Sequence, residues 1–435
     1  MPTVALRERR SRLTRRRALA GVIAVSVALL LAVVVANLGS DPPVVETLPS
    51  VAAADPAFAA TLEAQLGTPV VAGNRAALLL NGDEIFPAKL AAIRAARTSI
   101  TYAEYFWAAG DVAQAIADAL AERCRAGVAV RILLDGAGTL AMPREQLDTL
   151  LTAGCQVRTF RPLSDWSVRR DNNRNHRRVL VVDGRLGLTG GSGVSEKWTG
   201  DGRRDEHWRD TDLRLEGPAV RWLQAAFAEN WRETTHEILG GPAYFPPTPP
   251  AMGDTRLQIV RSSPTAGGYA VYTMLLLAMA SARRSILVTN PYFVLDDRML
   301  DTLVGAARHG VRVVLLAPGK IDHALVRSAG RGDFGRLLRA GVEIFEYQAA
   351  LLHSKTLVVD GVWATVGSTN LDNRSFALND ELNVAIYDAP LARRLEQAFD
   401  ADLRYARRLE YAAWQRRGLK TRLLEALALP FRDVL

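Results

Sequence analysis

Two similar stretches, HRRVLVVD over residues 176–183 and HSKTLVVD over residues 353–360, decide the fold and the chemistry of this sequence. Each begins with a histidine, carries a cation two residues later, continues as an apolar run and ends at an aspartate. The run predicts a β-strand, in which side chains two residues apart project from the same face. An imidazole held beside a fixed positive charge is suited to binding a phosphate group.

The similarity extends through most of the chain at nearly constant spacing. Three further pairs match: AARTSI at 95–100 with SARRSI at 281–286, RAGV at 125–128 with RHGV at 308–311, and LLTAG at 150–154 with LLRAG at 337–341. The members of these pairs are 186, 183 and 187 residues apart. Within each copy, helical patterns alternate with short apolar runs, and glycines end the helices. We therefore predict an α/β fold in which two pseudo-symmetric halves form one catalytic unit, with helices on both faces of the sheet.

Composition shifts along the chain give the expected boundaries. Five prolines between residues 239 and 254 separate the two copies. The predicted organisation is a basic tail (1–17), a transmembrane helix (18–38), a tether (39–75), a first half (76–238), a proline-rich linker (239–254) and a second half (255–435).

The charge is concentrated at the N-terminus. The 435 residues are 49% hydrophobic and 23% charged, which is typical of a globular protein, and carry a net charge of +8. Residues 1–17 hold seven arginines and one glutamate, so they account for most of this charge. The body is close to neutral, and we therefore expect no nucleic acid as a partner.

Residues 18–40 contain no charged side chain. About 20 apolar residues in a helix span a bilayer core of about 30 Å. The arginines before this stretch predict a single-pass anchor in the inner (cell) membrane, with the N-terminus in the cytoplasm and the body on the outer side. A cleaved signal peptide, with its cleavage site near Val34-Val35-Ala36, is the alternative.

Cys124 and Cys155 are the only cysteines. They exclude a disulfide framework and a four-cysteine zinc site. We expect two reduced, buried thiols, since free cysteine is among the most buried residue types. A single disulfide is the alternative if the body lies in an oxidising compartment.

The two motifs resemble the phospholipase D superfamily, which is marked by two copies of His-x-Lys-x4-Asp. The wider pattern is similar to the bacterial cardiolipin synthase branch, through NGD at 81–83, WRDT at 208–211 and GSTNLDNRSFALNDELN at 367–383. The resemblance covers roughly residues 75–430. It implies a membrane-anchored phosphatidyltransferase that acts on phospholipid, with phosphatidylglycerol as substrate and the lipid bilayer as partner.

Two histidines from matching halves can approach a phosphodiester from opposite sides. One imidazole would attack phosphorus to form a phosphohistidine, and the other would protonate the leaving alkoxide and later deprotonate the acceptor. This scheme requires no cofactor and no metal. The resemblance favours His176 as the nucleophile and His353 as the acid and base.

The remaining predicted site residues divide by role. Lys355 and Arg178 would neutralise the phosphate oxygens, and Asn370, Ser368 and Gly191 would contact substrate. By resemblance, Asp210 and Glu381 would orient the imidazoles. Asp183 and Asp360 complete the two motifs, but at strand ends we expect them to stabilise loops rather than to touch substrate.

The first motif departs from the family at two positions. Arg178 replaces the usual lysine, and Gly193 stands where the second copy has Asn370. Arginine keeps the charge but has a larger, planar head. A non-catalytic lipid-binding relative is therefore an open alternative. Two further alternatives to the transferase are a phospholipase D-type hydrolase, in which water is the acceptor, and a phosphodiesterase or nuclease.

Overall fold

The computed structural model describes residues 16–30, 45–163, 172–247, 251–264, 267–320 and 324–419, together with residues 422, 425 and 428. Most of the predicted basic tail (1–15), residues 31–44 of the predicted span and tether, and residues 248–250 of the predicted linker lie outside this part of the chain. The described residues contain one 15-stranded mixed sheet.

The first half begins after a short helix, α2 (Pro56–Leu66). Its elements, in chain order, are β1 (Val71–Leu80), α3 (Asn81–Ala95), β2 (Ser99–Glu104), α4 (Asp111–Arg125), β3 (Ala129–Asp135), α5 (Arg144–Thr152), β4 (Gln156–Phe160), β5 (Val179–Val182), β6 (Leu186–Gly190), the 3₁₀ turn η2 (Glu196–Trp198), β7 (Thr211–Glu216) and α7 (Val220–Thr235). Apolar, β-branched runs form the strands, and β2 and β5 are buried along their whole length.

The second half repeats this order with small additions. Its elements are β8 (Thr255–Ser262), α8 (Ala270–Ser281), β9 (Ser285–Thr289), α9 (Asp297–Arg308), β10 (Arg312–Pro318), α10 (Ala324–Arg331), α11 (Phe334–Arg339), β11 (Glu343–Tyr347), β12 (Thr356–Val359), β13 (Trp363–Gly367), α12 (Asn373–Ala377), β14 (Glu381–Ile386), α13 (Ala389–Leu403), β15 (Ala406–Arg408) and α14 (Tyr411–Gln415).

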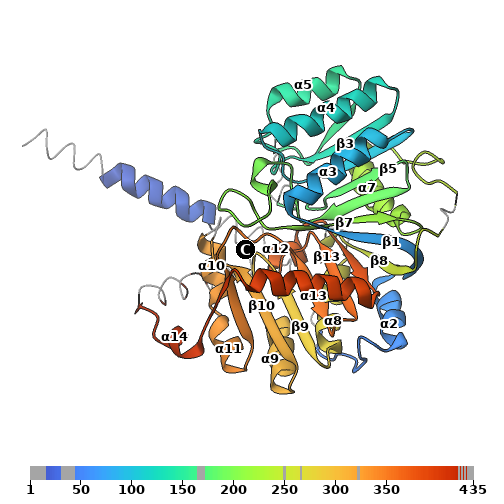
Figure 1. Ribbon diagram of the computed structural model, residues 1–435. Coiled ribbons are helices and arrows are strands. Elements are labelled where there is room, and N and C mark those ends of the chain that lie inside the picture. Colours follow the sequence, from blue (N-terminus) through green and yellow to red (C-terminus); the bar gives the residue numbers. More distant parts are fainter. Residues whose placement is uncertain are drawn as a thin grey trace, which may run out of the picture.

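The strand order shows the internal symmetry. The sheet runs β15-β11-β10-β9-β12-β13-β14-β8-β1-β7-β6-β5-β2-β3-β4, so the two halves meet where β8 pairs antiparallel with β1. Outward from this junction, each strand of the first half has its counterpart seven strands later in the chain. The predicted α/β fold with two matching halves is therefore confirmed, and Figure 1 shows the first half, in blue to green, above the second, in yellow to red.

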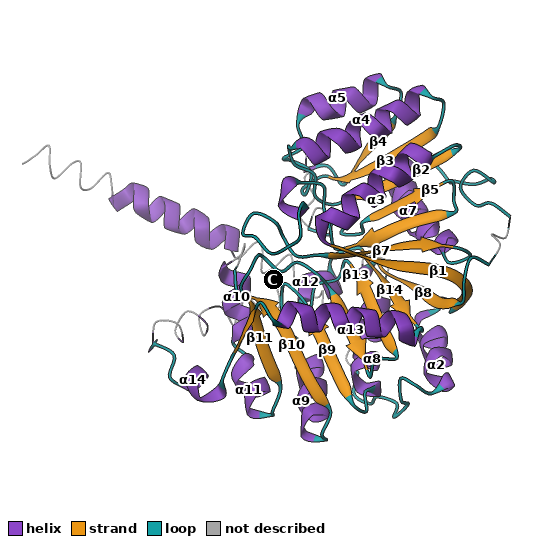
Figure 2. Ribbon diagram, in the orientation of Figure 1, coloured by secondary structure: helices purple, strands orange, loops and turns teal. Residues whose placement is uncertain are grey.

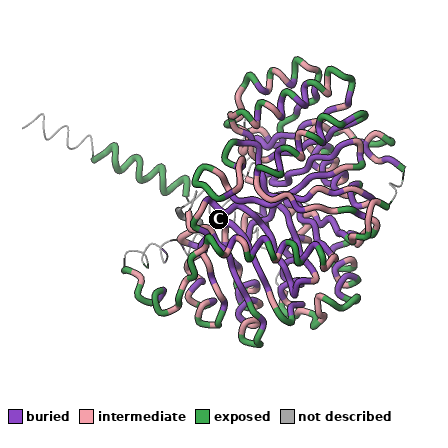
Figure 3. Tube along the Cα trace, in the orientation of Figure 1, coloured by how far each residue is buried: buried purple, intermediate pink, exposed green. Residues whose placement is uncertain are grey.

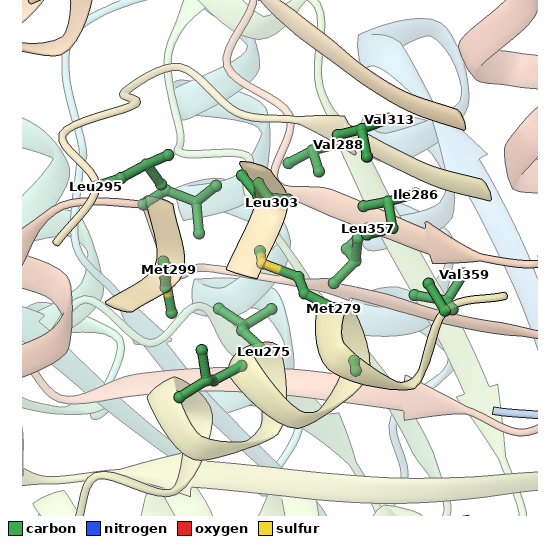
Figure 4. Close-up of a cluster of buried hydrophobic side chains, with 14 of the residues drawn as sticks. Leu275, Met279, Ile286, Val288, Leu295, Met299, Leu303, Val313, Leu357 and Val359 are labelled. Carbon is green, nitrogen blue, oxygen red and sulfur yellow. The ribbon is translucent and has the colours of Figure 1, made fainter. Parts of the chain in front are cut away.

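Helices cover the sheet in layers (Figure 2). One apolar core packs beneath α3, α4 and α5 of the first half, and another beneath α8 and α9 of the second. Figure 4 shows the second of these, with Leu275 and Met279 of α8 facing Ile286 and Val288 of β9. A third core contains residues of both halves and lies against α7 and α13. The buried strands consequently run through the middle of the molecule (Figure 3), and the shared core joins the halves into one body.

The expected membrane span is described only in part. Residues 16–30 form a helix whose side chains are exposed, and the helix projects from the body in Figure 1. The rest of the predicted span, residues 31–38, lies outside the described residues. Within the described ranges, no helix combines the length and the apolar character needed to cross a bilayer.

The prediction of two reduced thiols is wrong. Cys124, in the last turn of α4, and Cys155, just before β4, form a disulfide with their Cα atoms 5.5 Å apart. The contact joins residues 31 positions apart in the sequence. Their pairing follows from the way α5 returns the chain beside α4, which the residue types alone do not reveal.

Candidate active site

The two motif histidines lie at the junction of the halves, just before β5 and β12. The backbone N–H of His176 donates to the carbonyl of Asp380 at 2.9 Å, and that of His353 donates to the carbonyl of Arg209 at 2.8 Å. Asp380 comes directly before β14 of the second half, and Arg209 lies two residues before β7 of the first half. Each histidine is thus hydrogen-bonded to a residue of the opposite half. These reciprocal contacts bring the two motifs together.

The side chain of His176 is held by Glu381 of the second half. Its Nδ1 lies 2.8 Å from the Glu381 carboxylate, and the hydroxyl of Ser368 donates to the other carboxylate oxygen. A carboxylate only accepts hydrogen bonds, so Nδ1 carries the ring proton and Nε2 is left with a lone pair. Burial lowers the pKa of His176 to about 4, although Glu381 opposes the shift.

The side chain of His353 is held in the same way by Asp210 of the first half. Its Nδ1 lies 2.7 Å from the Asp210 carboxylate, which also accepts a 2.8 Å hydrogen bond from the indole N–H of Trp198. Burial and the ammonium group of Lys355 lower the pKa of His353. Burial alone would raise the pKa of Asp210, but His353 and Lys355 lower it overall. Each imidazole therefore uses a carboxylate from the other half.

The motif cations lie against the reactive nitrogens. Arg178 Nη2 is 3.2 Å from Nε2 of His176, and Lys355 Nζ lies across the edge of the His353 ring, 3.0 Å from Nε2 and 2.9 Å from Nδ1. Both cations also donate to the carbonyl of their own histidine, which fixes their position. Two positive groups and two Nε2 atoms therefore face the same region, as the binding of a phosphodiester requires.

Aromatic rings form the walls around the histidines. Tyr105 lies edge-on to His176 with ring centroids 4.7 Å apart, and Trp198 lies edge-on to His353 at 5.2 Å. Trp208 lies beside Trp198, with ring centroids 4.6 Å apart, and its own centroid is 5.4 Å from that of His353. These rings keep water away from the imidazoles and account for much of their burial.

In the first half, the Trp198 side chain lies next to the space that the side chain of Asn370 takes in the second half. A Cβ atom on Gly193, the counterpart of Asn370, would lie 3.1 Å from both Phe106 and Trp198, so there is little room for an asparagine. A Cβ atom on Gly191, the counterpart of Ser368, would lie 2.3 Å from an oxygen of Asp210. Trp198 supplies the carboxylate hydrogen bond that Ser368 supplies in the other half.

Asp183 and Asp360 lie at the far ends of β5 and β12 from the histidines. Asp183 accepts hydrogen bonds from the backbone N–H groups of residues 97–99, and Asp360 accepts them from residues 283–285. Both adopt a left-handed backbone, with φ of 53° and 55°. These contacts stabilise the loops before β2 and β9, even though both aspartates belong to the motifs that contain the histidines.

The structure brings most of the expected residues together. His176, His353, Arg178, Lys355, Asp210 and Glu381 form one buried cluster, which Ser368 and Gly191 support from behind the carboxylates. Asn370 is also buried, and its Oδ1 has no hydrogen-bond partner within the described residues. Sequence reasoning missed the crossing of the carboxylate partners and the part played by Trp198, which no repeated residue signals. In the described part of the chain, no group of three or more His, Cys, Asp and Glu side chains is placed to hold a metal.

The sequence matches a known protein family. A family described as "Cardiolipin synthase, PLD-like domain" matches residues 90–231 and 275–403. Cardiolipin synthase 1 of Bacillus anthracis is 33% identical over 368 residues, which is 83% of this chain and 72% of the relative. The major cardiolipin synthase ClsA of Bacillus subtilis is 34% identical over 358 residues, 82% of this chain and 74% of the relative.

Solved structures share the fold at much lower identity. A phosphatidylserine synthase of Haemophilus influenzae aligns with a TM-score of 0.64 and 12% identity, over 87% of this chain and all of that chain. A polyphosphate kinase of Porphyromonas gingivalis aligns with a TM-score of 0.52 and 13% identity, over 83% of this chain and 53% of that chain. At such identities the likeness concerns the fold alone.

Proposed function

The chain belongs to the cardiolipin synthase family of the phospholipase D superfamily, and from this premise we propose how its two motifs carry out phosphatidyl transfer. The enzyme is a phosphatidyltransferase. Its donor is phosphatidylglycerol, and its acceptor is the glycerol hydroxyl of a second phosphatidylglycerol. The products are cardiolipin and free glycerol, so all atoms of both substrates are accounted for.

The first step forms a covalent phosphatidyl-enzyme. Nε2 of His176 attacks the phosphorus atom of the donor, and the bond from phosphorus to the glycerol oxygen breaks. His353, as an imidazolium, gives its Nε2 proton to that oxygen. The anionic phosphodiester favours this protonated form, because a nearby negative charge raises the pKa of an imidazole.

In the second step His353 acts as a base, whereas in the first it acts as an acid. The hydroxyl of the acceptor lipid gives its proton to Nε2 of His353 and attacks phosphorus from the side that glycerol has left. The bond from phosphorus to His176 breaks, and neutral His176 is restored. Arg178 and Lys355 neutralise the non-bridging oxygens in both steps, with Asn370 as a further hydrogen-bond donor.

The crossed histidine–carboxylate pairs carry this proposal. Glu381 and Asp210 each fix the Nδ1–H tautomer of a histidine from the other half, at 2.8 and 2.7 Å, so both Nε2 atoms are available for chemistry. Each carboxylate also stabilises the positive charge that its imidazole acquires. A non-catalytic relative has no need of two such buried pairs, each of which costs desolvation.

The departures in the first motif fit an active enzyme. Arg178 lies 3.2 Å from Nε2 of His176, which is the position that a phosphate-binding cation needs. Gly193 leaves space that Trp198 and Phe106 fill, and Trp198 contributes to the site through Asp210. Both changes therefore have a structural compensation.

We propose that residues 18–38 anchor the enzyme in the cell membrane and that the body lies on the outer side. The arginines before the apolar stretch support this orientation. The disulfide of Cys124 and Cys155 supports it independently, because disulfides persist in oxidising compartments and are rare in the cytosol. An anchored site also meets its lipid acceptor at high local concentration.

The experiment that tests this function uses the purified full-length enzyme in bilayers of phosphatidylglycerol alone. Thin-layer chromatography of the products should show cardiolipin and an equal amount of glycerol, with phosphatidic acid as a minor product. A His309→Ala variant, in which an exposed histidine of the α9 terminus is lost, should behave like the wild type. If phosphatidic acid is the main product, the enzyme is a hydrolase and the proposed transferase function is wrong.

A further inference from the structure

Three buried ionic side chains lie behind the first motif, and the mechanism above uses none of them. Lys89, Glu104 and Asp212 are each at most 3% exposed. Lys89 Nζ lies 3.4 Å from the Asp212 carboxylate and donates to Ser192 at 2.9 Å, while the hydroxyl of Ser192 donates to Asp212 at 2.6 Å. Glu104 lies at the end of β2, beside Arg178 of the motif.

The second half keeps the packing of this cluster but not its charges. At the equivalent positions of the second copy, Leu275 replaces Lys89 and Asn290 replaces Glu104. The registers of β6–β7 and β13–β14 match Asn383 with Asp212 in the same way. Thr369 donates to Asn383 at 2.7 Å, as Ser192 donates to Asp212. Leu275 lies in the apolar cluster of Figure 4. The fold therefore does not require the three ionic groups.

The hydrogen bonds of Glu104 fit an ionised carboxylate. One oxygen accepts from the backbone N–H groups of Tyr105 and Phe106 at 3.0 and 3.4 Å, and the other accepts from the Tyr102 hydroxyl at 3.2 Å. All three neighbours donate, and a carboxylate has only acceptors to offer. The first of these oxygens is also 3.9 Å from Nε of Arg178, a buried atom with no hydrogen bond among the described residues.

We propose that Glu104 is a positioning residue for Arg178, which it holds by offsetting the guanidinium charge so that positive charge can develop on His176. This inference rests on the proposed function. Attack on phosphorus makes the imidazole ring positive, and Arg178 Nη2 lies only 3.2 Å from the attacking nitrogen. In a buried site, an unbalanced guanidinium would oppose that step.

Lys89 and Asp212 complete the balance. Burial raises the pKa of Glu104 overall, and the positive charges of Lys89 and Arg178 oppose this shift, in the direction that favours the ionised form. Asp212 in turn faces Lys89, so the four side chains together carry no net charge. In the second half a neutral amide takes the place of Glu104. The two motifs therefore lie in different charge backgrounds, and the negative charge of Glu104 lies on the side of His176, the histidine that becomes positive when it attacks phosphorus.

The test uses the full-length enzyme with phosphatidyl-p-nitrophenol in phosphatidylcholine vesicles. Nitrophenolate leaves without a proton, so the rate constant of its pre-steady-state burst reports the attack by His176 alone. Glu104→Gln keeps the acceptor for Tyr105 but removes the charge. We expect the saturating burst rate constant to fall about 10-fold, the half-saturating substrate concentration of the burst not to rise, and the acidic limb of the burst-rate profile to move to lower pH by about one unit. The limb moves down because loss of a negative charge makes imidazolium less stable.

Two further variants separate charge from packing. Lys89→Met combined with Glu104→Gln restores neutrality, and the burst rate constant and acidic limb of this double variant should return toward those of the wild type. A structural role predicts instead that the double variant is worse than the single one. Glu104→Asp keeps the charge and should retain the wild-type acidic limb, which provides the test even if the double variant does not fold.

The outcomes distinguish this inference from the proposed function. If the wild type releases no nitrophenolate, the proposed function fails. If the wild type is active and Glu104→Gln keeps the wild-type burst rate constant and acidic limb, the charge-balance inference alone is overturned. A rise in the half-saturating substrate concentration of the burst with an unchanged burst rate constant overturns it as well, because Glu104 would then serve substrate binding only.

Discussion

At the scale of the residue, the site depends on how each ionic group is paired. Arg178 stands where the family pattern has lysine, and its guanidinium both contacts Nε2 of His176 and lies over the Tyr105 ring, with its Cζ 5.6 Å from the ring centroid. The contact places a positive charge beside the nitrogen that we propose to attack phosphorus. The charge, rather than the planar head, is what the reaction needs there.

Variants of Arg178 test this interpretation. Arg178→Ala deletes the cation and should lower kcat/KM for phosphatidylglycerol by about 100-fold or more, whereas Arg178→Lys should lose less than about 10-fold. Steady-state kinetics of both variants, with thermal unfolding to confirm folding, provide the measurement. Wild-type activity in Arg178→Ala would mean that the first-half cation is dispensable.

At the scale of the element, Asp183 and Asp360 hold the turns that lead into β2 and β9. Burial alone would raise the pKa of Asp183, but hydrogen bonds from Ser99, Thr98 and Arg97 lower it overall. A carboxyl whose pKa is lower in the folded state stabilises the fold above its unfolded pKa, and this contribution is lost as pH falls through its folded pKa.

We therefore expect Asp183→Ala to lower Tm at pH 7 by about 2–5 °C, since backbone N–H groups lose their acceptor and alanine must adopt a left-handed backbone. The difference from the wild type should shrink below about pH 4. Activity of the folded variant at 25 °C should stay within about threefold of the wild type. Loss of activity without loss of stability would place Asp183 in the chemistry instead.

At the scale of the whole molecule, the sequence predicts the repeat, the two halves and most of the site. The spacing of His176 and His353 in matching motifs carries that information. The crossing of Asp210 and Glu381 between halves depends on the junction of β1 with β8, which no local pattern encodes. The disulfide of Cys124 and Cys155 depends likewise on the return of the chain beside α4. Nothing in the sequence points to Trp198, because the second copy has a serine, Ser375, at the matching position.

The proposed topology predicts how the whole molecule behaves in cells. The mature protein should keep residues 1–38 and resist extraction by high salt, because an apolar span does not depend on charge. Protease added to cells stripped of any outer layer should digest the body. Maleimide should label Cys124 and Cys155 only after reduction. A soluble form that begins near Asn37 would show instead that the N-terminal segment is a cleaved signal.

The central claim is that His176 forms the covalent bond to the phosphatidyl group and that His353 donates and accepts the proton. The most direct measurement is the burst of nitrophenolate from phosphatidyl-p-nitrophenol, whose leaving group needs no acid, followed by peptide mapping of the trapped lipid phosphate. We predict that His353→Ala releases close to one equivalent per enzyme and retains the label on His176, while His176→Ala releases none. A burst from His176→Ala with label on His353, or equal steady release by both variants without label, would contradict the account.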